Sequence, residues 1–239
     1  VAVRPRGGGG AAREGAELDL QWPDGRIASA YMNYDVHKAG AGDDAAFLRE
    51  AAVLRALSGP LAYAGVRVAP YYASVPDQRA LVCGMIPGKD RFGAITDTAQ
   101  RDTLAQDFMA QLAALHRIDV TAHPIDGMGP VEPAEVFIRR RIAELRAGND
   151  GNAWDPLIHL SLNWLEANIP ADMPAPVIVH GDAGPGNFLY EEDRVTALLD
   201  WELVHYGDPM ADLAMLALRM LFQGFVPLPQ AFAAYEAAG

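Results

Sequence analysis

Two short apolar segments, each followed at once by acidic residues, constrain the fold of this chain more than any other feature. Segment 177–179 leads directly into His180-Gly-Asp182, and segment 197–199 leads into Asp200. Apolar runs of this length predict buried strands, and the second run follows a polar turn as the return strand of a hairpin. The fold is therefore expected to present polar side chains at the mouth of paired strands.

Asp182, Asn187 and Asp200 together offer the donors that phosphoryl transfer needs. That reaction requires a carboxylate that accepts the proton of the attacking hydroxyl, and hard oxygen ligands for Mg²⁺. The loop between Asp182 and Asn187 contains two glycines and a proline, so it can fold back and turn both side chains toward one metal ion. The alternative interpretation is that each of the three is an ordinary strand-end or turn residue.

The rest of the chain divides into two parts of different character. Strands are predicted over 17–22, 27–32, 66–72 and 79–85, with a helix that starts at Asp43 or Asp44 and ends before Gly59. After Pro87-Gly88, helical spacing dominates: the predicted helices lie over 104–115 and 137–145 and after the caps Asp155 and Asp208. We expect a nucleotide-binding lobe over residues 1–86 and a catalytic and substrate lobe over 87–239.

Composition narrows the classes of partner and the compartment. The chain has 239 residues and a net charge of −12, which disfavours nucleic acid and anionic membrane and is compatible with a cationic small molecule, although acidity can serve solubility alone. No apolar run is long enough to cross a bilayer, and no secretory signal is visible. The single cysteine, Cys83, makes a reducing, cytoplasmic location the default expectation.

The motifs of the second part resemble one known group of enzymes. The chain resembles the aminoglycoside phosphotransferase and choline kinase-like superfamily. The resemblance is greatest to its broad phosphotransferase branch, which includes kinase domains linked to acyl-CoA dehydrogenases. The matching motifs are His180-Gly-Asp182 with Asn187, Asp200-Trp-Glu202, Gly207-Asp-Pro209, Asp212-Leu-Ala214, Arg49-Glu-Ala51, Leu115–Asp119 and Gly9–Glu14. The resemblance implies an α+β, bilobal protein-kinase-like fold, with a small strand-rich N-lobe and a larger, mainly helical C-lobe. Members of this family continue past the position that matches residue 239, so we expect the second lobe to be truncated at its end.

The resemblance also implies roles for individual residues of the second lobe. Asp182 is the expected catalytic base, spaced from Asn187 as in the protein-kinase catalytic loop. Asn187 and Asp200 are the expected Mg²⁺ ligands. Asp212 is expected to brace the catalytic loop, and His180 to be structural within it.

In the first lobe, the resemblance implies a nucleotide site. Gly9 and Gly10 belong to the expected phosphate-covering loop, Glu50 to the helix that faces the phosphates, and Met85 to the boundary between the lobes. The family carries a Lys or Arg on the third strand as the partner of the helix glutamate, but here that position falls at Tyr31 or a neighbour. The expected substitutes for this partner are Arg26, Lys38 or Arg13.

The function that follows is phosphoryl transfer from ATP or GTP, with Mg²⁺, to a hydroxyl of a small molecule. Aminoglycoside-like antibiotics, macrolides, amino alcohols and hydroxyacyl-CoA esters are all open as acceptors, and the oligomeric state is open too. A catalytically weak nucleotide-binding module is the alternative, because the strand lysine is missing. A metal-dependent hydrolase is less favoured, because the sequence has no His-rich ligand set. His116, His123 and His159 are expected to be packing or surface residues.

Overall fold

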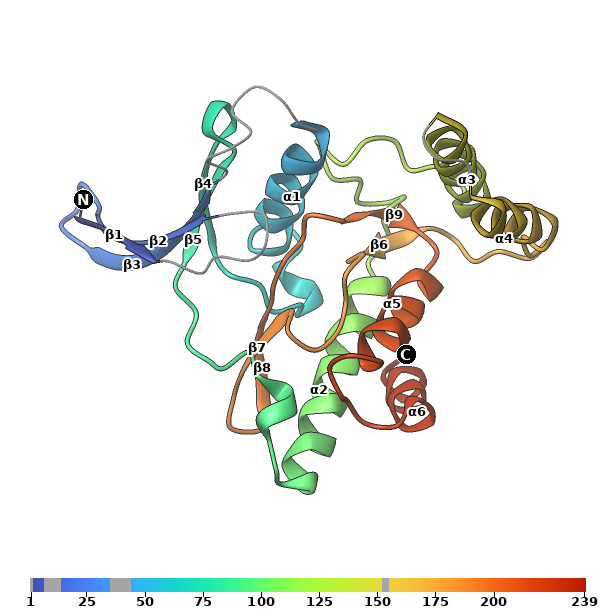
Figure 1. The fold of residues 1–239 in the computed structure, drawn as a ribbon. Helices are drawn as coiled ribbons and strands as arrows, with labels where there is room; N and C mark the ends of the chain where they lie inside the picture. The colour runs from blue at the N-terminus through green and yellow to red at the C-terminus, as the bar shows by residue number, and fades with distance from the viewer. Residues whose placement is uncertain (1, 7–13, 35–43, 152–154) are drawn as a thin grey trace.

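The computed structural model describes residues 2–6, 14–34, 44–151 and 155–239, and it forms the two lobes expected from the sequence (Figure 1). The small lobe is an antiparallel sheet in the order β1-β2-β3-β5-β4, with helix α1 packed beside it. Its elements are β1 (Ala2–Arg6), β2 (Glu14–Gln21), β3 (Ile27–Tyr34), α1 (Asp44–Leu57), β4 (Tyr71–Val75) and β5 (Ala80–Gly84). The bilobal, kinase-like α+β prediction is confirmed.

The β2–β3 hairpin forms where the turn signal predicts it. Gln21 pairs with Ile27, and Gly25 adopts φ +85°, a conformation that glycine reaches without a Cβ clash. The Asp24 carboxylate accepts hydrogen bonds from the backbone and the side chain of Arg26. The turn contacts are therefore consistent with the register of these two strands.

The strand predicted over 66–72 is wrong, because β4 begins only at Tyr71. The preceding segment leaves the sheet and crosses to the second lobe, where the amide of Leu198 donates to the Arg67 carbonyl over 2.8 Å. The Arg67 guanidinium pairs with Asp107 and also donates to the Val195 carbonyl. The apolar alternation of this segment thus reflects packing between the lobes.

The large lobe is built around a long buried helix, α2 (Thr98–His116), beside which α6 (Leu228–Ala238) packs (Figure 1). Two short antiparallel pairs, β6 with β9 and β7 with β8, lie between α2 and the small lobe. The remaining elements are α3 (Ala134–Gly151), α4 (Pro156–Ala167), β6 (Val177–Val179), β7 (Phe188–Glu191), β8 (Arg194–Leu198), β9 (His205–Gly207) and α5 (Met210–Met220). The structure also has strands β1 and β9, which the sequence patterns do not predict.

Two helices in this lobe begin where the sequence predicts them. The Asp155 carboxylate caps α4 and accepts from the amides of Leu157 and Ile158. At α5 the N-cap residue is Pro209 instead of Asp208, whose carboxylate accepts from the amide of Met210. Helices α3 and α4 project together away from the rest of the lobe (Figure 1). None of the helices among the described residues combines the length and the apolar character needed to span a membrane.

The linker between the lobes is fixed by hydrogen bonds on both sides. The Met85 amide donates to the Ser29 carbonyl on β3, while the hydroxyl of Thr196 on β8 donates to the Pro87 carbonyl. Lys89 and Tyr190 then exchange two backbone hydrogen bonds. The chain leaves the sheet after Gly84, and the division into units 1–86 and 87–239 stays a prediction.

Candidate active site

Asp182 and Asn187 are joined side chain to side chain across the loop that follows β6. The Asn187 amide nitrogen Nδ2 lies 2.7 Å from Asp182 Oδ2 and 2.8 Å from the Asp182 carbonyl oxygen. Because a carboxylate and a carbonyl only accept hydrogen bonds, Nδ2 must be the atom that faces Asp182. The Asn187 oxygen Oδ1 is therefore turned away from Asp182, as a metal ligand requires.

Arg219, on the last turn of α5, completes the environment of the Asp182 carboxylate. Its Nη1 lies 2.5 Å from Asp182 Oδ1, and its Nε and Nη2 both donate to the Pro185 carbonyl, over 3.2 and 2.9 Å. Each Asp182 oxygen thus has one fixed hydrogen-bond partner. Arg219 is not among the site residues predicted from the sequence, although its spacing of seven from Asp212 places both on one helix face.

Asp212 braces the backbone at the start of the same loop. Its carboxylate is fully buried and accepts from the amides of His180 and Gly181, both over 2.8 Å, and from His116 Nε2 over 3.0 Å. Burial alone would raise the pKa of Asp212, but the hydrogen bond from His116 and the other donors outweigh it and hold that pKa below its ordinary value. Gly181 has φ +88°, and a Cβ there would sit 2.4 Å from the carbonyl oxygen of Leu203.

Asp200 follows β8 and lies beside the same loop. The amide of the preceding residue, Leu199, donates to the Asn187 carbonyl over 2.8 Å, so the two expected metal ligands sit on adjoining backbone. Asp200 is exposed and has φ +63°, a left-handed conformation that aspartate tolerates better than most residues. Next to it, the buried ring of Trp201 contacts His180 at a centroid distance of 4.4 Å.

His180 is buried at the junction of these two segments. Its Nδ1 accepts from the Asp182 amide over 3.3 Å. Burial is the main cause that lowers the pKa of His180, so the imidazole is neutral near pH 7. A neutral, enclosed ring that packs on Trp201 and contacts the Asp182 backbone fits the structural role expected for it.

The donors at this site fit a hard divalent cation. An amide oxygen and a carboxylate, on Asn187 and Asp200, are ligand types that Mg²⁺ accepts, with its remaining positions filled by water and phosphate oxygens. No group of three or more His, Cys, Asp or Glu side chains suited to a metal ion occurs within the part of the chain that the structure describes.

In the small lobe, Glu50 is buried on α1, close enough to Cys83 for its charge to act on that thiol. Burial and the nearby charge of Glu50 raise the pKa of the Cys83 thiol to about 12. Cys83 on β5 pairs with Tyr31 on β3. Tyr31 is therefore the neighbour, on the next strand, of the cysteine whose pKa the charge of Glu50 raises. The Tyr31 hydroxyl extends over β2 to Gly15, where it would lie 1.9 Å from an added Cβ.

The expected substitutes for the strand lysine are only partly placed. Arg26 lies in the β2–β3 turn, where its Nε is 2.7 Å from Asp24 Oδ2. This turn is at the opposite end of the hairpin from Gly15. Arg26 is therefore not the partner of Glu50 in this structure. Lys38 and Arg13 lie outside the described residues, as do Gly9 and Gly10.

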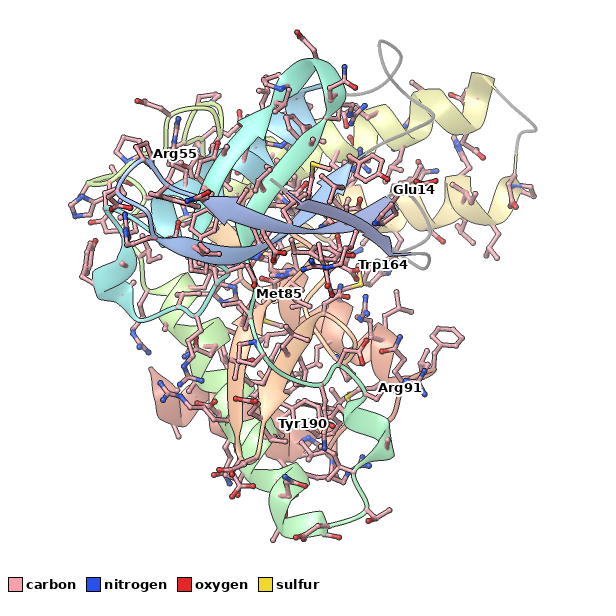
Figure 2. The ribbon with its side chains drawn as sticks, turned by 90° about the vertical axis from the view of Figure 1, so that its left-hand side faces the viewer. Glu14, Arg55, Met85, Arg91, Trp164 and Tyr190 are labelled. Atoms are coloured by element: carbon pink, nitrogen blue, oxygen red, sulfur yellow. The ribbon has the colours of Figure 1, made fainter. Side chains whose placement is uncertain are left out.

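Met85 lies in the linker, below the strands of the small lobe and above the hairpin that carries Tyr190 (Figure 2). It is 39% exposed, and its amide is bound to Ser29. The structure thus places Met85 at the junction of the lobes, and the nucleotide contact there stays a prediction from the sequence.

Comparison with known proteins gives one family. A sequence profile described as "Phosphotransferase enzyme family" matches residues 36–239. Acyl-CoA dehydrogenase family member 11 of Gallus gallus is 34% identical over 107 residues, which are 43% of this chain and 13% of that protein. The protein of the same name from Rattus norvegicus is 28% identical over 134 residues, 54% of this chain and 17% of that protein. The chain thus spans less than a fifth of the length of these curated relatives.

Solved structures share the fold over nearly the whole chain. A putative aminoglycoside phosphotransferase from Ralstonia eutropha has a TM-score of 0.74 at 21% identity, covering 99% of this chain and 74% of that one. Macrolide 2'-phosphotransferase MphH from Brachybacterium faecium has a TM-score of 0.69 at 21% identity, covering 100% and 77%. An aminoglycoside phosphotransferase in ternary complex with ADP and hygromycin B has a TM-score of 0.70 at 15% identity, covering 99% and 77%.

Proposed function

The chain belongs to the phosphotransferase enzyme family, and from that membership we propose that it transfers the terminal phosphoryl group of ATP or GTP, with Mg²⁺, to a hydroxyl of a small molecule. The observation that carries this proposal is the contact between Asp182 Oδ2 and Asn187 Nδ2 at 2.7 Å. It fixes a carboxylate and an amide oxygen in one rigid loop, next to the second carboxylate of Asp200.

In the proposed reaction, Asp182 accepts the proton of the acceptor hydroxyl and orients its oxygen toward the phosphate. Catalysis of phosphoryl transfer is mostly positioning and charge stabilisation, so a carboxylate held at both oxygens suits the task. Mg²⁺ bound by Asn187 and Asp200 would neutralise charge on the nucleotide phosphates. Arg219 and Asp212 keep the loop in shape.

The nucleotide is proposed to bind between the units 1–86 and 87–239. Met85 supplies linker backbone beside the base, Glu50 helps to organise the phosphate end, and Gly9 and Gly10 cover the phosphates. The position of Met85 between the lobes and the buried position of Glu50 support this arrangement.

The acceptor is proposed only as a class: an aminoglycoside-like antibiotic or macrolide, an amino alcohol or a hydroxyacyl-CoA ester. Antibiotic phosphotransferases share the fold, while the curated relatives carry acyl-CoA dehydrogenase names. The net charge of −12 favours a cationic acceptor through long-range attraction. We place this activity in the cytoplasm, in keeping with the single cysteine.

The direct test is a turnover screen. Purified protein is incubated with ATP or GTP, Mg²⁺ and a panel of hydroxylated antibiotics, amino alcohols and hydroxyacyl-CoA esters, and nucleoside diphosphate release is followed. Acceptor-dependent release in the wild type that is lost in Asp182→Asn supports the proposal, since the amide keeps the shape but cannot take the proton. Release that is independent of any acceptor would indicate a hydrolase.

A nucleotide-binding module with weak catalysis is the second candidate. Tyr31 favours it, because this strand position carries no cation to hold the phosphates. Calorimetry that detects Mg²⁺-dependent nucleotide binding, together with no turnover across the full panel, would favour the module over the kinase.

A further inference from the structure

A chain of buried hydrogen bonds connects helix α6 to the loop that carries Asp182. The Tyr235 hydroxyl, on α6, lies 2.7 Å from His116 Nδ1 at the end of α2. The opposite ring nitrogen, His116 Nε2, lies 3.0 Å from Asp212 Oδ2. The same oxygen accepts from the His180 amide, and Asp212 Oδ1 accepts from the Gly181 amide.

The directions of the two hydrogen bonds at the His116 ring depend on its tautomer. The pKa of Asp212 is lowered, so its carboxylate is ionised near pH 7 and can only accept. The proton of the hydrogen bond between His116 and Asp212 therefore belongs to His116 Nε2. In the tautomer that carries its proton on Nε2, Nδ1 accepts, and the Tyr235 hydroxyl donates to it. Burial raises the pKa of Tyr235, which keeps the phenol protonated for that purpose. One tautomer of His116 therefore satisfies every group.

We propose that His116 and Tyr235 are positioning residues for the transfer reaction, and that they act through Asp212 on the backbone of His180 and Gly181; this inference rests on the proposed function. Tyr235 fixes the ring plane of His116, His116 fixes one carboxylate oxygen of Asp212, and Asp212 fixes the two amides that precede Asp182. The role goes beyond the packing that the sequence suggested for His116.

Precise placement matters here because the Asp182 loop is held at its start and along its length by different groups. Asn187 and Arg219 hold the Asp182 carboxylate, whereas Asp212 alone accepts the amides of His180 and Gly181 among the described residues. Gly181 has no room to shift toward Leu203, since even a Cβ would lie 2.4 Å from the Leu203 carbonyl oxygen. A displaced Asp212 carboxylate would therefore release the two amides that precede Asp182.

The kinetic test uses substitutions that remove one link at a time. Tyr235→Phe removes only the hydroxyl, His116→Gln keeps a donor for Asp212, and His116→Leu removes both links. Tyr71→Phe is the matched control, because its half-buried hydroxyl makes one hydrogen bond, to Ser74, in the small lobe. We expect kcat to fall by roughly 10-fold in Tyr235→Phe and up to about 100-fold in His116→Leu, with KM for nucleotide and acceptor within about twofold.

The result for His116→Gln separates positioning from packing. If the hydrogen bond to Asp212 is what matters, His116→Gln keeps most of the kcat that His116→Leu loses. If packing is what matters, leucine is the better replacement for the ring, and His116→Gln loses more kcat than His116→Leu. Unchanged kcat in both Tyr235→Phe and His116→Leu, with a lower melting temperature alone, would overturn the proposal and leave a purely structural network.

A second readout does not depend on turnover. Amide hydrogen exchange at His180 and Gly181 is expected to quicken by roughly 10-fold or more in His116→Leu, and less in Tyr235→Phe, while Tyr71→Phe matches the wild type. If the wild type phosphorylates no acceptor, the proposed function fails, yet this exchange still shows whether His116 and Tyr235 act on the backbone of His180 and Gly181. Equal exchange rates at both amides in all variants would contradict the inference.

Discussion

Arg219 and Asp182 form a close ion pair, with Nη1 of the arginine 2.5 Å from Oδ1 of the aspartate, and each side chain is mostly buried. The arginine also ties itself to the Pro185 carbonyl, so a single side chain from α5 spans the catalytic loop. Helix α5 therefore contributes to the site at both of its ends, through Asp212 near its start and Arg219 at its finish.

Arg219→Gln is expected to lower kcat by roughly 10- to 100-fold, because the amide can still reach Pro185 but no longer holds Asp182 Oδ1. The measurement is steady-state turnover with the acceptor identified in the screen. Arg140→Gln provides the control, since Arg140 on α3 pairs with Glu132 just before that helix and with Glu144 on it, outside the candidate site. Equal kcat in both variants would remove Arg219 from the site.

Asp182→Ala is expected to reduce turnover by roughly 10²–10⁴-fold, the usual effect of losing a positioned base. Nucleotide affinity measured by calorimetry should stay close to that of the wild type, because the metal ligands are untouched. A variant with near-normal turnover would show that another group takes the proton.

Asp200→Asn and Asn187→Ala are expected to weaken nucleotide binding in the presence of Mg²⁺ and to leave binding without Mg²⁺ unchanged. Each removes a hard oxygen ligand or a negative charge from the cation site. Titrations with and without the metal give the comparison. Equal Mg²⁺-dependent affinity in the wild type and both variants would contradict the assignment of these ligands.

Tyr31→Lys is expected to strengthen nucleotide binding in the absence of Mg²⁺, because it places a cation beside the charge of Glu50 and the phosphates. In the wild type, binding should depend strongly on the metal. Tyr63→Lys, at an exposed tyrosine outside the sheet, controls for the change in net charge. If the wild type binds tightly without metal and Tyr31→Lys changes nothing, the alignment of β3 with the family pattern is wrong.

The sequence predicted those elements whose signals are local. The Pro23-Asp-Gly25 turn lies in the first hairpin, and the carboxylates of Asp155 and Asp208 bind amides at the starts of α4 and α5. In each case the determining contacts lie within a few residues, so a pattern read along the chain contains them.

The segment 66–72 and the supporting residues of the site behaved differently. The alternating pattern predicted a strand around Arg67, but the partners of this residue, Asp107 and Val195, lie 40 and 128 residues away in the sequence. Arg219 reaches Asp182 across 37 residues, and Tyr235 reaches His116 across 119. Such contacts depend on how helices pack, which the periodicity of one segment does not contain.

The β7–β8 hairpin is the place where a segment of the small lobe and the start of the large lobe both attach. The Leu198 amide donates to the Arg67 carbonyl, and Lys89 exchanges two backbone hydrogen bonds with Tyr190. Because β7 begins at Phe188, only one peptide bond separates this hairpin from Asn187. The hairpin therefore couples the backbone of the small lobe to the loop that carries the expected metal ligand.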